Sequence, residues 1–542
     1  MFVNIPEWEL KCGFDPTTVT VRDKPALSTS DSPLPTNFPL AEDVLKNNAP
    51  FDVGLLPLRD PEHYVSGHIH NYLDKWKFIL EKDINDDKTC VLDWLEHGVD
   101  VNKFFRHFKG NFKGRHFDSN IPHKQYFQNS ASCAKYADFI SRELCERIST
   151  VCIKLLGIVG FCQPPKVVML LTIEPSKPRL CHDERFLNLW IKDLPFHLET
   201  LKDIHHLVQK NGLMVTFDDK SGYDHVKLSE SSYTYFGIQF GGYFMTYTTL
   251  PFGWKGSAFV YQTIGMCVTS YLRSLSILNT LYIDDRFAVS NPTLDGPGHK
   301  ESSACLTYVV LQVLMRLGYT LSLNKCSLEP STCKKFLGFL VDSEKQAYIL
   351  PVDKRMKFSE LREFILSLDK VSLKTLQRFC GKCIAMSLAV PGCKLFCREV
   401  NAAISYFIKN SKIITVTCAL TEELTYWRFI DSWSGCSKWR PEFHKTLKMY
   451  TDSSLFRYGA KVESVGEAMS FGDYWSIDDN RPIHEKEADA ILKSLESLGG
   501  RLLNSRVDVM TDNMAVIGAW NNQGAKCQNL NRILKQISAE YC

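Results

Sequence analysis

The sequence predicts an α+β protein built from several domains, and three observations support this prediction. The chain has 542 residues, a length at which two to four domains are expected. Hydrophobic residues make up 44% of the chain and charged residues 23%, as in ordinary globular proteins. Short strand-like segments that end on aspartates recur along the chain, and longer stretches of helical pattern separate them.

The chain is expected to have five parts. Residues 1–60 are rich in Pro, Ser, Thr and Asp and are predicted to be a disordered extension. Residues 61–150 follow a helical pattern, and residues 151–345 carry the densest motifs. Residues 346–440 are again helical, and residues 441–542 combine strands with amphipathic helices.

The most informative segment is Tyr282-Ile283-Asp284-Asp285, in which two adjacent acids lie between apolar flanks. The flanks favour strands and Asp favours turns, so a β-hairpin is expected to present both carboxylates. Adjacent carboxylates repel each other unless a cation neutralises them. A divalent metal ion is therefore the expected partner of Asp284 and Asp285.

A site for two metal ions needs a further carboxylate from another segment, because bridging oxygens must come from more than one direction. The candidate is Asp218, which ends a short buried strand predicted over residues 214–217. Gly222 follows and is expected to allow close packing of the chain. Asp219 and Asp224 lie nearby, and we expect them at the surface or facing the backbone.

In order, spacing and chemistry, residues 150–345 resemble the fingers and palm of a reverse transcriptase. Asp218 matches the first catalytic acid, and residues 282–285 match the Y-x-D-D hairpin. Residues 250–262 match the loop and helix that contact template and nucleotide, although Ala258 stands where the family often has Pro. Three further segments fit the family: residues 177–188 (fingers strand), 317–326 (lysine segment) and 336–339 (primer-grip hairpin).

The resemblance implies a right-hand polymerase with fingers, palm and thumb, the last or a connection lying in residues 346–440. It implies an RNA-directed DNA polymerase that binds an RNA template, a DNA primer and dNTPs. Asp218, Asp284 and Asp285 would hold two Mg²⁺ ions, or Mn²⁺ instead. The substrate-binding residues that it implies are Lys177, Arg179, Tyr223, Phe252, Gly253, Gln262 and Lys325.

Several of these residues have an implied role or an alternative. Arg179 and Lys177 would bind phosphate oxygens, and Tyr223 would crowd the sugar 2′ carbon and so select deoxynucleotides. Lys325 would protonate pyrophosphate or simply be solvated. Gln262 would contact the template or pack inside its helix. We expect Asp183 and Arg185 to form an ion pair of the fingers.

A second set of acids follows in residues 441–542. Asp452 ends an apolar strand, Glu487 begins an amphipathic helix, and Asp512 ends another strand. In this order, after a polymerase palm, they resemble a linked ribonuclease H (RNase H) domain, an α/β fold whose acids hold Mg²⁺ to cut the RNA of an RNA–DNA hybrid. The family has a fourth carboxylate farther on. We expect a C-terminally truncated domain, or one without that ligand, and weak or absent nuclease activity.

The net charge of +3 is small, so binding of nucleic acid is expected to depend on local basic segments. In one such segment, basic residues alternate with aromatic residues. Basic side chains suit contact with phosphates, and aromatic side chains suit stacking on nucleobases. The alternative is a helix with an aromatic core face and a solvated basic face. The basic residues are Lys103, Arg106, Lys109, Lys113 and Arg115, and the interleaved ring residues are Phe104, Phe105, His107, Phe108 and Phe112.

Cysteine usage and hydropathy suggest where the protein works. The 19 cysteines are scattered, no signal peptide is apparent, and no segment has the length of a membrane span. Reduced thiols in the cytoplasm or nucleus are therefore expected, and secretion or membrane insertion is not. Cys380, Cys383, Cys393 and Cys397 have a zinc-like spacing but also suit packed helices.

The loop at residues 250–253 and the Arg-x3-Asp-x-Arg-x2-Asn spacing from Arg179 most resemble retrotransposon enzymes, particularly those of DIRS-type elements. Such elements integrate with a tyrosine recombinase, so an element-encoded recombinase or integrase is a possible partner. Two alternatives stay open. One is a decayed or host-retained element protein that binds nucleic acid without synthesis, and the other is a DNA-templated or template-independent polymerase with the same palm.

Overall fold

The computed structural model describes most of the chain, which divides into two compact units, residues 1–336 (unit 1) and 337–542 (unit 2). The described residues are 5–23, 34–36, 61–81, 89–174, 178–292, 299–390, 392–410, 414–439, 445–464, 466–503 and 505–541.

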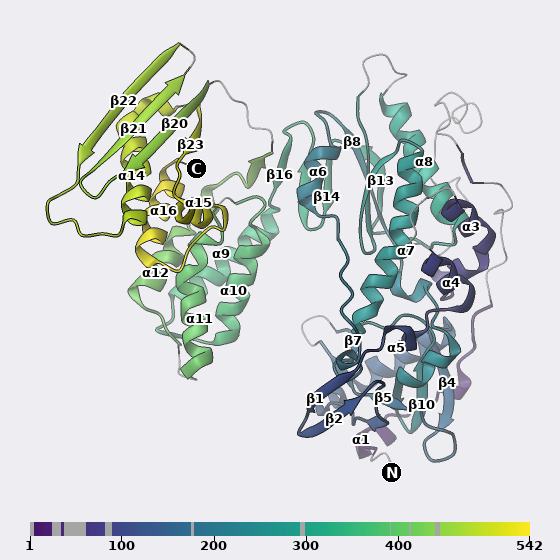
Figure 1. The fold of residues 1–542 in the computed structure, drawn as a ribbon. Helices are drawn as coiled ribbons and strands as arrows, with labels where there is room; N and C mark the ends of the chain where they lie inside the picture. Colours follow the sequence, from purple (N-terminus) through teal and green to yellow (C-terminus); the bar gives the residue numbers. More distant parts are fainter. Residues whose placement is uncertain are drawn as a thin grey trace. The chain divides into compact units, whose positions relative to one another are not determined.

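Unit 1 contains a fingers region built on a mixed sheet with the strand order β3-β5-β9-β10-β4 (Figure 1). These strands are β3 (Gln125–Tyr126), β4 (Ile153–Ile158), β5 (Val167–Met169), β9 (Gly237–Phe240) and β10 (Tyr243–Tyr247). Aromatic and β-branched residues fill β9 and β10, which suits strands that are buried almost throughout. Helix α5 (Ala137–Ser149) packs on β4, and β6 (Leu171–Ile173) pairs with β7 (Leu180–His182).

The start of the chain packs against this sheet. Residues 5–23, which we expected to be disordered, include α1 (Glu7–Leu10) and form part of the core. The Phe14 ring lies 5.3 Å from the Phe240 ring, and the buried Glu9 carboxylate accepts hydrogen bonds from Asn129 and Gln239. The segment is ordered by these tertiary contacts in spite of its polar composition. Most of the remaining expected extension, residues 24–33 and 37–60, lies outside the described residues.

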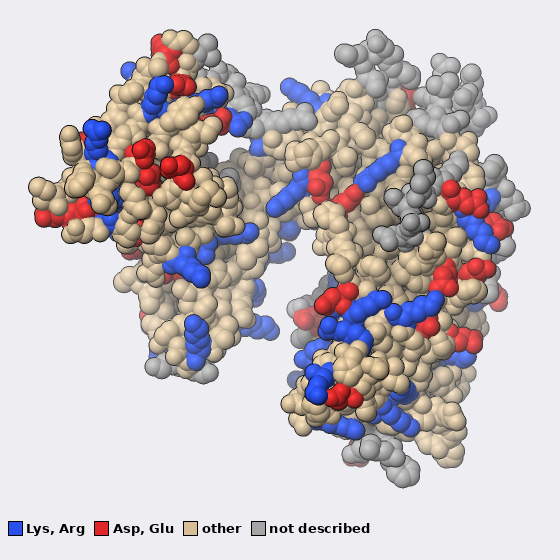
Figure 2. Space-filling model, viewed as in Figure 1, with Lys and Arg blue, Asp and Glu red and all other residues tan. Residues whose placement is uncertain are grey.

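Residues 61–150 are less helical than expected. They begin with α3 (Leu73–Glu81) and α4 (Thr89–His97), but β1 (Phe108–Phe112) and β2 (Arg115–Ser119) then form a hairpin. Its turn residues, Lys113 and Gly114, both have positive φ, as a type I′ turn requires. Phe112 and Phe117 pack on Phe186, with ring centroids 5.6 and 5.4 Å away. The five basic residues of the segment are exposed, and Lys and Arg side chains gather over this hairpin (Figure 2).

The palm of unit 1 is an antiparallel sheet with the strand order β11-β12-β8-β13. Its apolar strand residues are buried against α7 (Lys255–Ser274) and α8 (His299–Arg316), which contact the sheet (Figure 1). The shorter α6 (Leu201–Leu207) starts with a capping box of Thr200 and Asp203. The palm strands are β8 (Leu213–Asp218), β11 (Leu278–Tyr282), β12 (Asp285–Ser290) and β13 (Ser327–Ser331), and β14 (Cys333–Phe336) ends the unit.

Unit 2 begins with a helical region, as expected for residues 346–440. Its helices are α9 (Val352–Leu366), α10 (Leu373–Ala385), α11 (Arg398–Asn410), α12 (Cys418–Tyr426) and α13 (Phe429–Ser432). The core surrounds Trp427, whose indole N–H donates to the Phe396 carbonyl at 2.9 Å. Short strands accompany the helices: β15 (Phe339–Asp342), β16 (Ala347–Ile349) and β19 (Cys436–Lys438) form one sheet, and β17 (Lys370–Val371) pairs with β18 (Ile414–Thr415).

The rest of unit 2 is a sheet with the strand order β22-β21-β20-β23 (Figure 1). The strands are β20 (Lys445–Ser453), β21 (Arg457–Ser464), β22 (Glu467–Tyr474) and β23 (Ser505–Met510). The first three are antiparallel, while β23 lies parallel to β20, because α14 (Ile483–Leu498) forms part of the connection. Helix α14 packs on β20 and β21, and α15 (Met514–Asn521) and α16 (Gln528–Tyr541) pack on α14.

Within the described ranges, the search for helices long and apolar enough to cross a membrane found none.

Candidate active sites

Three acids meet at one end of the palm sheet. Asp218 is the last residue of β8 and Asp285 the first of β12, and the strand register pairs them directly. Tyr282 pairs with Asp285, so Ile283 and Asp284 form a two-residue turn, as the sequence predicts. Ile283 has a φ of +57°, which is uncommon for a β-branched residue and is typical of strained turns at functional sites.

Gln262 holds this turn from the inside. Its side chain is buried, its Oε1 accepts the Ile283 N–H at 2.8 Å, and its Nε2 donates to the Leu281 carbonyl at 3.3 Å. Both polar atoms of the Gln262 side chain therefore bind the hairpin of β11 and β12, neither of which lies in the helix of Gln262. Contact of Gln262 with template stays a prediction.

The charges of the palm acids favour a bound cation. Burial raises the pKa of Asp285 to about 6, and the carboxylates of Asp284 and Asp218 contribute to the rise. Burial also raises the pKa of Asp284. Lys325 supplies one positive charge, with its Nζ 3.1 Å from Asp218 Oδ1. Lys325 alone does not balance the negative charge of the three carboxylates, so a bound cation would stabilise them. Because all of these donors are oxygens, they suit Mg²⁺ or Mn²⁺.

Asp219 and Asp224 are buried, so the expectation that they lie at the surface is wrong. The Asp219 carboxylate accepts a hydrogen bond from the Tyr261 hydroxyl at 2.6 Å and pairs with Arg286 at 3.0 Å. Its backbone N–H donates to the Asp284 carbonyl at 3.1 Å. The Asp224 carboxylate accepts from the Cys152 thiol at 3.3 Å. Asp219 thus stabilises the turn that carries Asp284 through its backbone N–H, a role that the sequence does not indicate.

Tyr223 lies beside the acids. Its ring packs against the Phe252 ring with 4.9 Å between centroids and a tilt of 50° between the ring planes. Burial, followed by the charge of Asp284, raises the pKa of Tyr223 to about 12. Phe252 is 52% exposed and so forms an open wall of the site. Gly222, the preceding residue, lets the chain approach Tyr261 closely, because a Cβ atom there would lie 3.0 Å from the Tyr261 ring.

The side chain of Asn188 binds the backbone of the loop before α7. Gly253 has a φ of +94°, which favours glycine. Asn188 donates to the Gly253 carbonyl and accepts the Lys255 N–H, both at 2.8 Å. Asn188 therefore fixes the loop that carries Phe252. The sequence places Asn188 only in a motif spacing, and no sequence signal indicates its bridging role.

The fingers residues are partly described. Lys177 lies outside the described residues, whereas Arg179 is exposed immediately before β7. Asp183 and Arg185 form the expected ion pair, with Arg185 Nη2 2.6 Å from Asp183 Oδ2.

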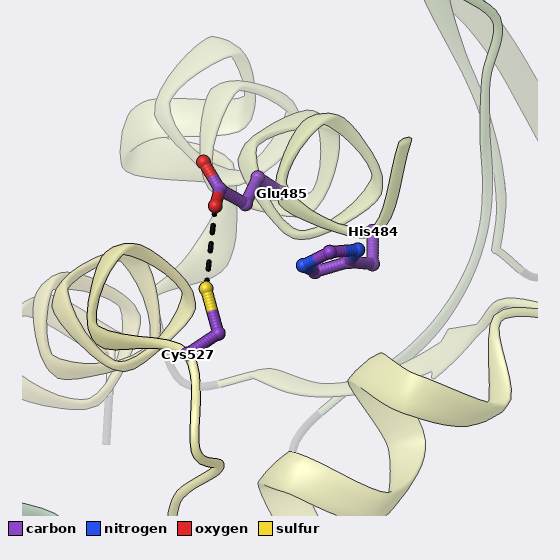
Figure 3. A group of neighbouring side chains, drawn as sticks. All are labelled: His484, Glu485 and Cys527. Carbon is purple, nitrogen blue, oxygen red and sulfur yellow. Dashed lines mark hydrogen bonds between the residues drawn. The ribbon is translucent and has the colours of Figure 1, made fainter. Parts of the chain in front are cut away.

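Unit 2 contains two groups of side chains with metal-ligating atoms close together. The first is Asp452, Glu487 and Asp512, from β20, α14 and the segment after β23. One oxygen from each carboxylate lies within 4.8 Å of the others. The second is His484, Glu485 and Cys527 (Figure 3). Among the described residues, neither the palm acids nor the four cysteines 380, 383, 393 and 397 meet the same distance limit.

Glu487 is the buried member of the acid group. Burial raises its pKa to about 7, and the neighbouring carboxylates of Asp452 and Asp512 contribute to the rise. The Ser453 N–H donates to Asp452 Oδ1 at 2.8 Å and to Glu487 Oε1 at 3.2 Å. Three carboxylates that repel one another at this distance suit a divalent cation, as the palm acids do.

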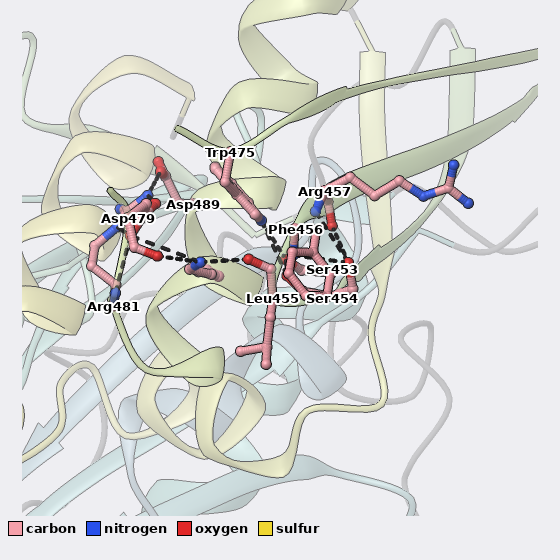
Figure 4. Close-up of polar contacts among 10 residues, drawn as sticks. Ser453, Ser454, Leu455, Phe456, Arg457, Trp475, Asp479, Arg481 and Asp489 are labelled. Atoms are coloured by element: carbon pink, nitrogen blue, oxygen red, sulfur yellow. Dashed lines mark hydrogen bonds and ion pairs between the residues drawn. The ribbon is translucent and has the colours of Figure 1, made fainter. Parts of the chain in front are cut away.

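A polar network fixes the turn beside this group (Figure 4). The Trp475 indole N–H lies 3.1 Å from Ser453 Oγ and 3.2 Å from the Ser454 carbonyl. The buried ammonium of Lys486 donates to the carbonyls of Leu455 and Asp479, both at 2.8 Å. The turn that follows Asp452 is thereby tied to the helix that carries Glu487.

The four cysteines of the helical region are packed thiols. All four are buried; Cys393 donates to the Val390 carbonyl at 3.0 Å and Cys380 to Asn401 at 3.3 Å. Burial, followed by the neighbouring Cys397, raises the pKa of the Cys383 thiol far above its usual range. Of the two readings of this spacing, packed helices fit the structure.

Comparisons with known proteins agree with the palm geometry. Residues 172–341 match the family model described as reverse transcriptase (RNA-dependent DNA polymerase). None of the curated proteins matches the sequence. Residues 172–341 of the chain therefore form a reverse transcriptase (RNA-dependent DNA polymerase) domain, in a protein with the predicted mixed α+β fold.

Three solved structures, all of a foamy viral protease-reverse transcriptase, are similar to this chain. The dRH form with double-stranded DNA has 15% identity and a TM-score of 0.49, covering 88% of this chain and 81% of that one. The second, with double-stranded DNA, has 14% identity and a TM-score of 0.48, covering 90% and 97%. The third, with an RNA/DNA hybrid, has 14% identity and a TM-score of 0.49, covering 89% and 62%.

Proposed function

We propose that this polymerase extends a DNA primer on an RNA template with Asp218, Asp284 and Asp285 as ligands of two Mg²⁺ ions, for which Mn²⁺ could substitute. The observation that supports this best is the register of β8 and β12, which pairs Asp218 with Asp285 beside the turn that carries Asp284. When bound, the two cations would activate the primer 3′-hydroxyl and neutralise the triphosphate.

The surrounding side chains have complementary roles in this proposal. Lys325, close to Asp218, donates a proton to the leaving pyrophosphate. Arg179 binds phosphate oxygens bidentately, with Lys177 as a second positive charge. Tyr223, which packs against Phe252, excludes a ribose 2′-hydroxyl. Replacing Tyr223 with Ala should admit ribonucleotides, and unchanged selectivity for dNTPs in single-nucleotide incorporation would assign the selection elsewhere.

Primer extension on poly(rA)/oligo(dT) with Mg²⁺ tests the metal assignment. The wild-type chain should extend the primer, whereas Asp284→Asn should bind the hybrid but not extend it. Asp353→Asn, an exposed aspartate of α9, is the matched control and should extend normally. Extension by Asp284→Asn would contradict the assignment. Failure of folded wild-type protein to extend a hybrid that it binds would favour the alternative, a nucleic-acid-binding protein without synthesis.

We further propose that the acid group of unit 2 is an RNase H-like site for the RNA strand of an RNA–DNA hybrid, with the weak or absent cleavage that the sequence predicts. Its support is the convergence of Asp452, Glu487 and Asp512, together with a sheet in which β20 and β23 are parallel and α14 packs on β20. These carboxylates would hold Mg²⁺ beside the scissile phosphate. Incubation with a hybrid labelled in its RNA strand tests this activity directly.

The origin of the chain is also a proposal. We infer a retrotransposon source, of DIRS type, from the loop at residues 250–253 and the motif spacing from Arg179. A tyrosine recombinase reading frame beside the gene would support this inference, and a different integration enzyme there would oppose it.

A further inference from the structure

We propose that His484, Glu485 and Cys527 form a zinc-binding site in unit 2. An imidazole nitrogen, a carboxylate oxygen and a thiol sulfur all lie within 4.8 Å of one another. His484 and Glu485 are consecutive residues in the first turn of α14, and Cys527 immediately precedes α16. The side chains of the two helix starts face each other, with the His484 ring beside the Glu485–Cys527 hydrogen bond (Figure 3).

The Glu485 carboxylate provides an independent reason for a bound cation. Its residue is only 3% exposed. Oε1 accepts the Cys527 thiol proton at 3.2 Å and the Asn529 amide at 3.4 Å. Oε2 is also buried, and it has no hydrogen-bond partner within the described part of the chain. A buried carboxylate oxygen without a partner is costly, and a metal ion would satisfy it.

The ligand set selects the kind of metal. Mg²⁺ and Ca²⁺ prefer oxygen donors alone, whereas nitrogen, oxygen and thiolate sulfur together suit Zn²⁺. Zinc binds such ligands at about 2.0–2.3 Å, so its ligand atoms lie roughly 3.5 Å apart in a tetrahedron. Closing the present group therefore needs a movement of about 1 Å. The Cys527 thiol would release its proton to solvent on binding, and water would take the fourth position.

This site is separate from the acid group in the same helix. Glu485 and Glu487 are two positions apart, and residues at that spacing point to opposite sides of an α-helix. The two groups share no residue. Zinc at the first site would fasten the start of α14 to the start of α16, two helices that already pack together. Its expected role is structural, because it would fix the helix that carries Glu487.

Metal analysis of the full-length protein tests this proposal. After incubation with Zn²⁺ and dialysis against buffer with millimolar Mg²⁺, which occupies the oxygen sites, the wild type should retain one zinc per chain. Cys527→Ala and His484→Ala should each lose that zinc. Cys418→Ala is the matched control: Cys418 is an exposed cysteine at the start of α12, and its variant should retain the metal.

Cobalt substitution identifies the sulfur ligand. Co²⁺ bound to a thiolate gives a charge-transfer band in the near ultraviolet, which the wild type and Cys418→Ala should show. Cys527→His should retain one metal per chain but lose the band, which separates loss of the ligand from misfolding. Primer extension by unit 1 verifies that each variant remains active elsewhere. Absence of zinc from the wild type, or retention of both zinc and band by Cys527→Ala, would overturn the proposal.

Discussion

The palm acids and the acid group of unit 2 use the same functional groups but are stabilised differently. Asp218 and Asp285 face each other across neighbouring strands, with the ammonium of Lys325 3.1 Å from Asp218. Glu487 instead lies within 4.8 Å of two carboxylates, and the charged neighbours that act on it are acids. Burial is the largest cause of the raised pKa in both groups, about 6 for Asp285 and about 7 for Glu487. Lys325 opposes the rise at Asp285, whereas the carboxylates of Asp452 and Asp512 add to it at Glu487, and in both groups a cation would relieve the repulsion.

The largest effect is expected for Glu487→Gln, which should lower the activity of the acid group of unit 2 and leave that of the palm acids unchanged. Hybrid cleavage should fall on the order of 100- to 1,000-fold, because one metal ligand supplies several kcal/mol of transition-state stabilisation. Primer extension should not change. Without metal, unit 2 should become more stable, because a buried repulsive charge is removed. Cleavage assays and thermal unfolding measure both effects. Glu496→Gln, at an exposed position of the same helix, is the control, and equal loss of cleavage in both variants would refute the assignment.

Arg286→Leu should have the next largest effect, because it removes the buried ion pair with Asp219. It leaves the buried Asp219 without its cation, which typically costs about 3–5 kcal/mol. Urea unfolding of unit 1 should show this loss, and primer extension should fall with it. The double change Asp219→Asn with Arg286→Leu should recover part of the stability. Arg428→Leu removes an exposed ion pair with Glu363 and should cost less than about 1 kcal/mol; a similar cost for both arginines would show that burial does not matter here.

Acid should destabilise unit 1 through His70. Its Nδ1 lies 2.8 Å from the Leu95 carbonyl and its Nε2 accepts the Lys227 N–H at 2.8 Å, so only the neutral ring fits. Burial, followed by the charge of Lys227, lowers its pKa to about 4. Below pH 6.5 the unfolded chain binds a proton that the folded chain does not, so stability falls as pH falls. From pH 7.5 to 5 the loss is about 2 kcal/mol.

Urea unfolding at both pH values checks this expectation. The wild type should lose about 2 kcal/mol more than His70→Gln over this interval. His116→Gln, at an exposed position of β2, should behave as the wild type does. Equal pH dependence in the His70→Gln variant would show that another group is responsible.

The smallest effect is expected for substitutions of Gln262. Gln262→Ala leaves the Ile283 N–H without its acceptor, at a cost of about 1–2 kcal/mol, so the rate of extension should fall roughly 10-fold. Gln262→Met has a similar volume but no acceptor, so it should lose about as much activity as Gln262→Ala. Single-turnover incorporation measures both, and unchanged incorporation by both variants would show that the bond to Ile283 is not needed.

The hairpin at residues 278–290 was predictable because its information is local: strand-forming flanks, a turn of fixed length and adjacent acids. The hairpin at residues 108–119 was missed for a physical reason. Phe104, Phe108 and Phe112 recur every four residues, a spacing that fits one face of a helix and also one face of a strand. Only packing on Phe186 and Trp190 decides between them.

Asp218 and Asp219 also show that a sequence pattern does not reveal contacts between distant segments. Asp218 and Asp219 are neighbours of identical chemistry, and the sequence distinguished them only by the spacing to Tyr223. The structure leaves Asp218 beside Lys325 and pairs Asp219 with Arg286, a residue 67 positions away. A sequence pattern does not reveal which acid finds a buried cation, because that contact depends on the pairing of β8 with β12.

By itself, the sequence determined the order of the palm motifs, the positions of the acids at strand ends, and the polymerase chemistry that they indicate. These features depend on short-range preferences of turns, strands and charges. The tertiary structure alone decided the burial of Asp219, the inward position of Gln262, the packing of the four cysteines, and the meeting of His484 with Cys527. Each of these depends on contacts between distant segments, whose free energy exists only once the chain has folded.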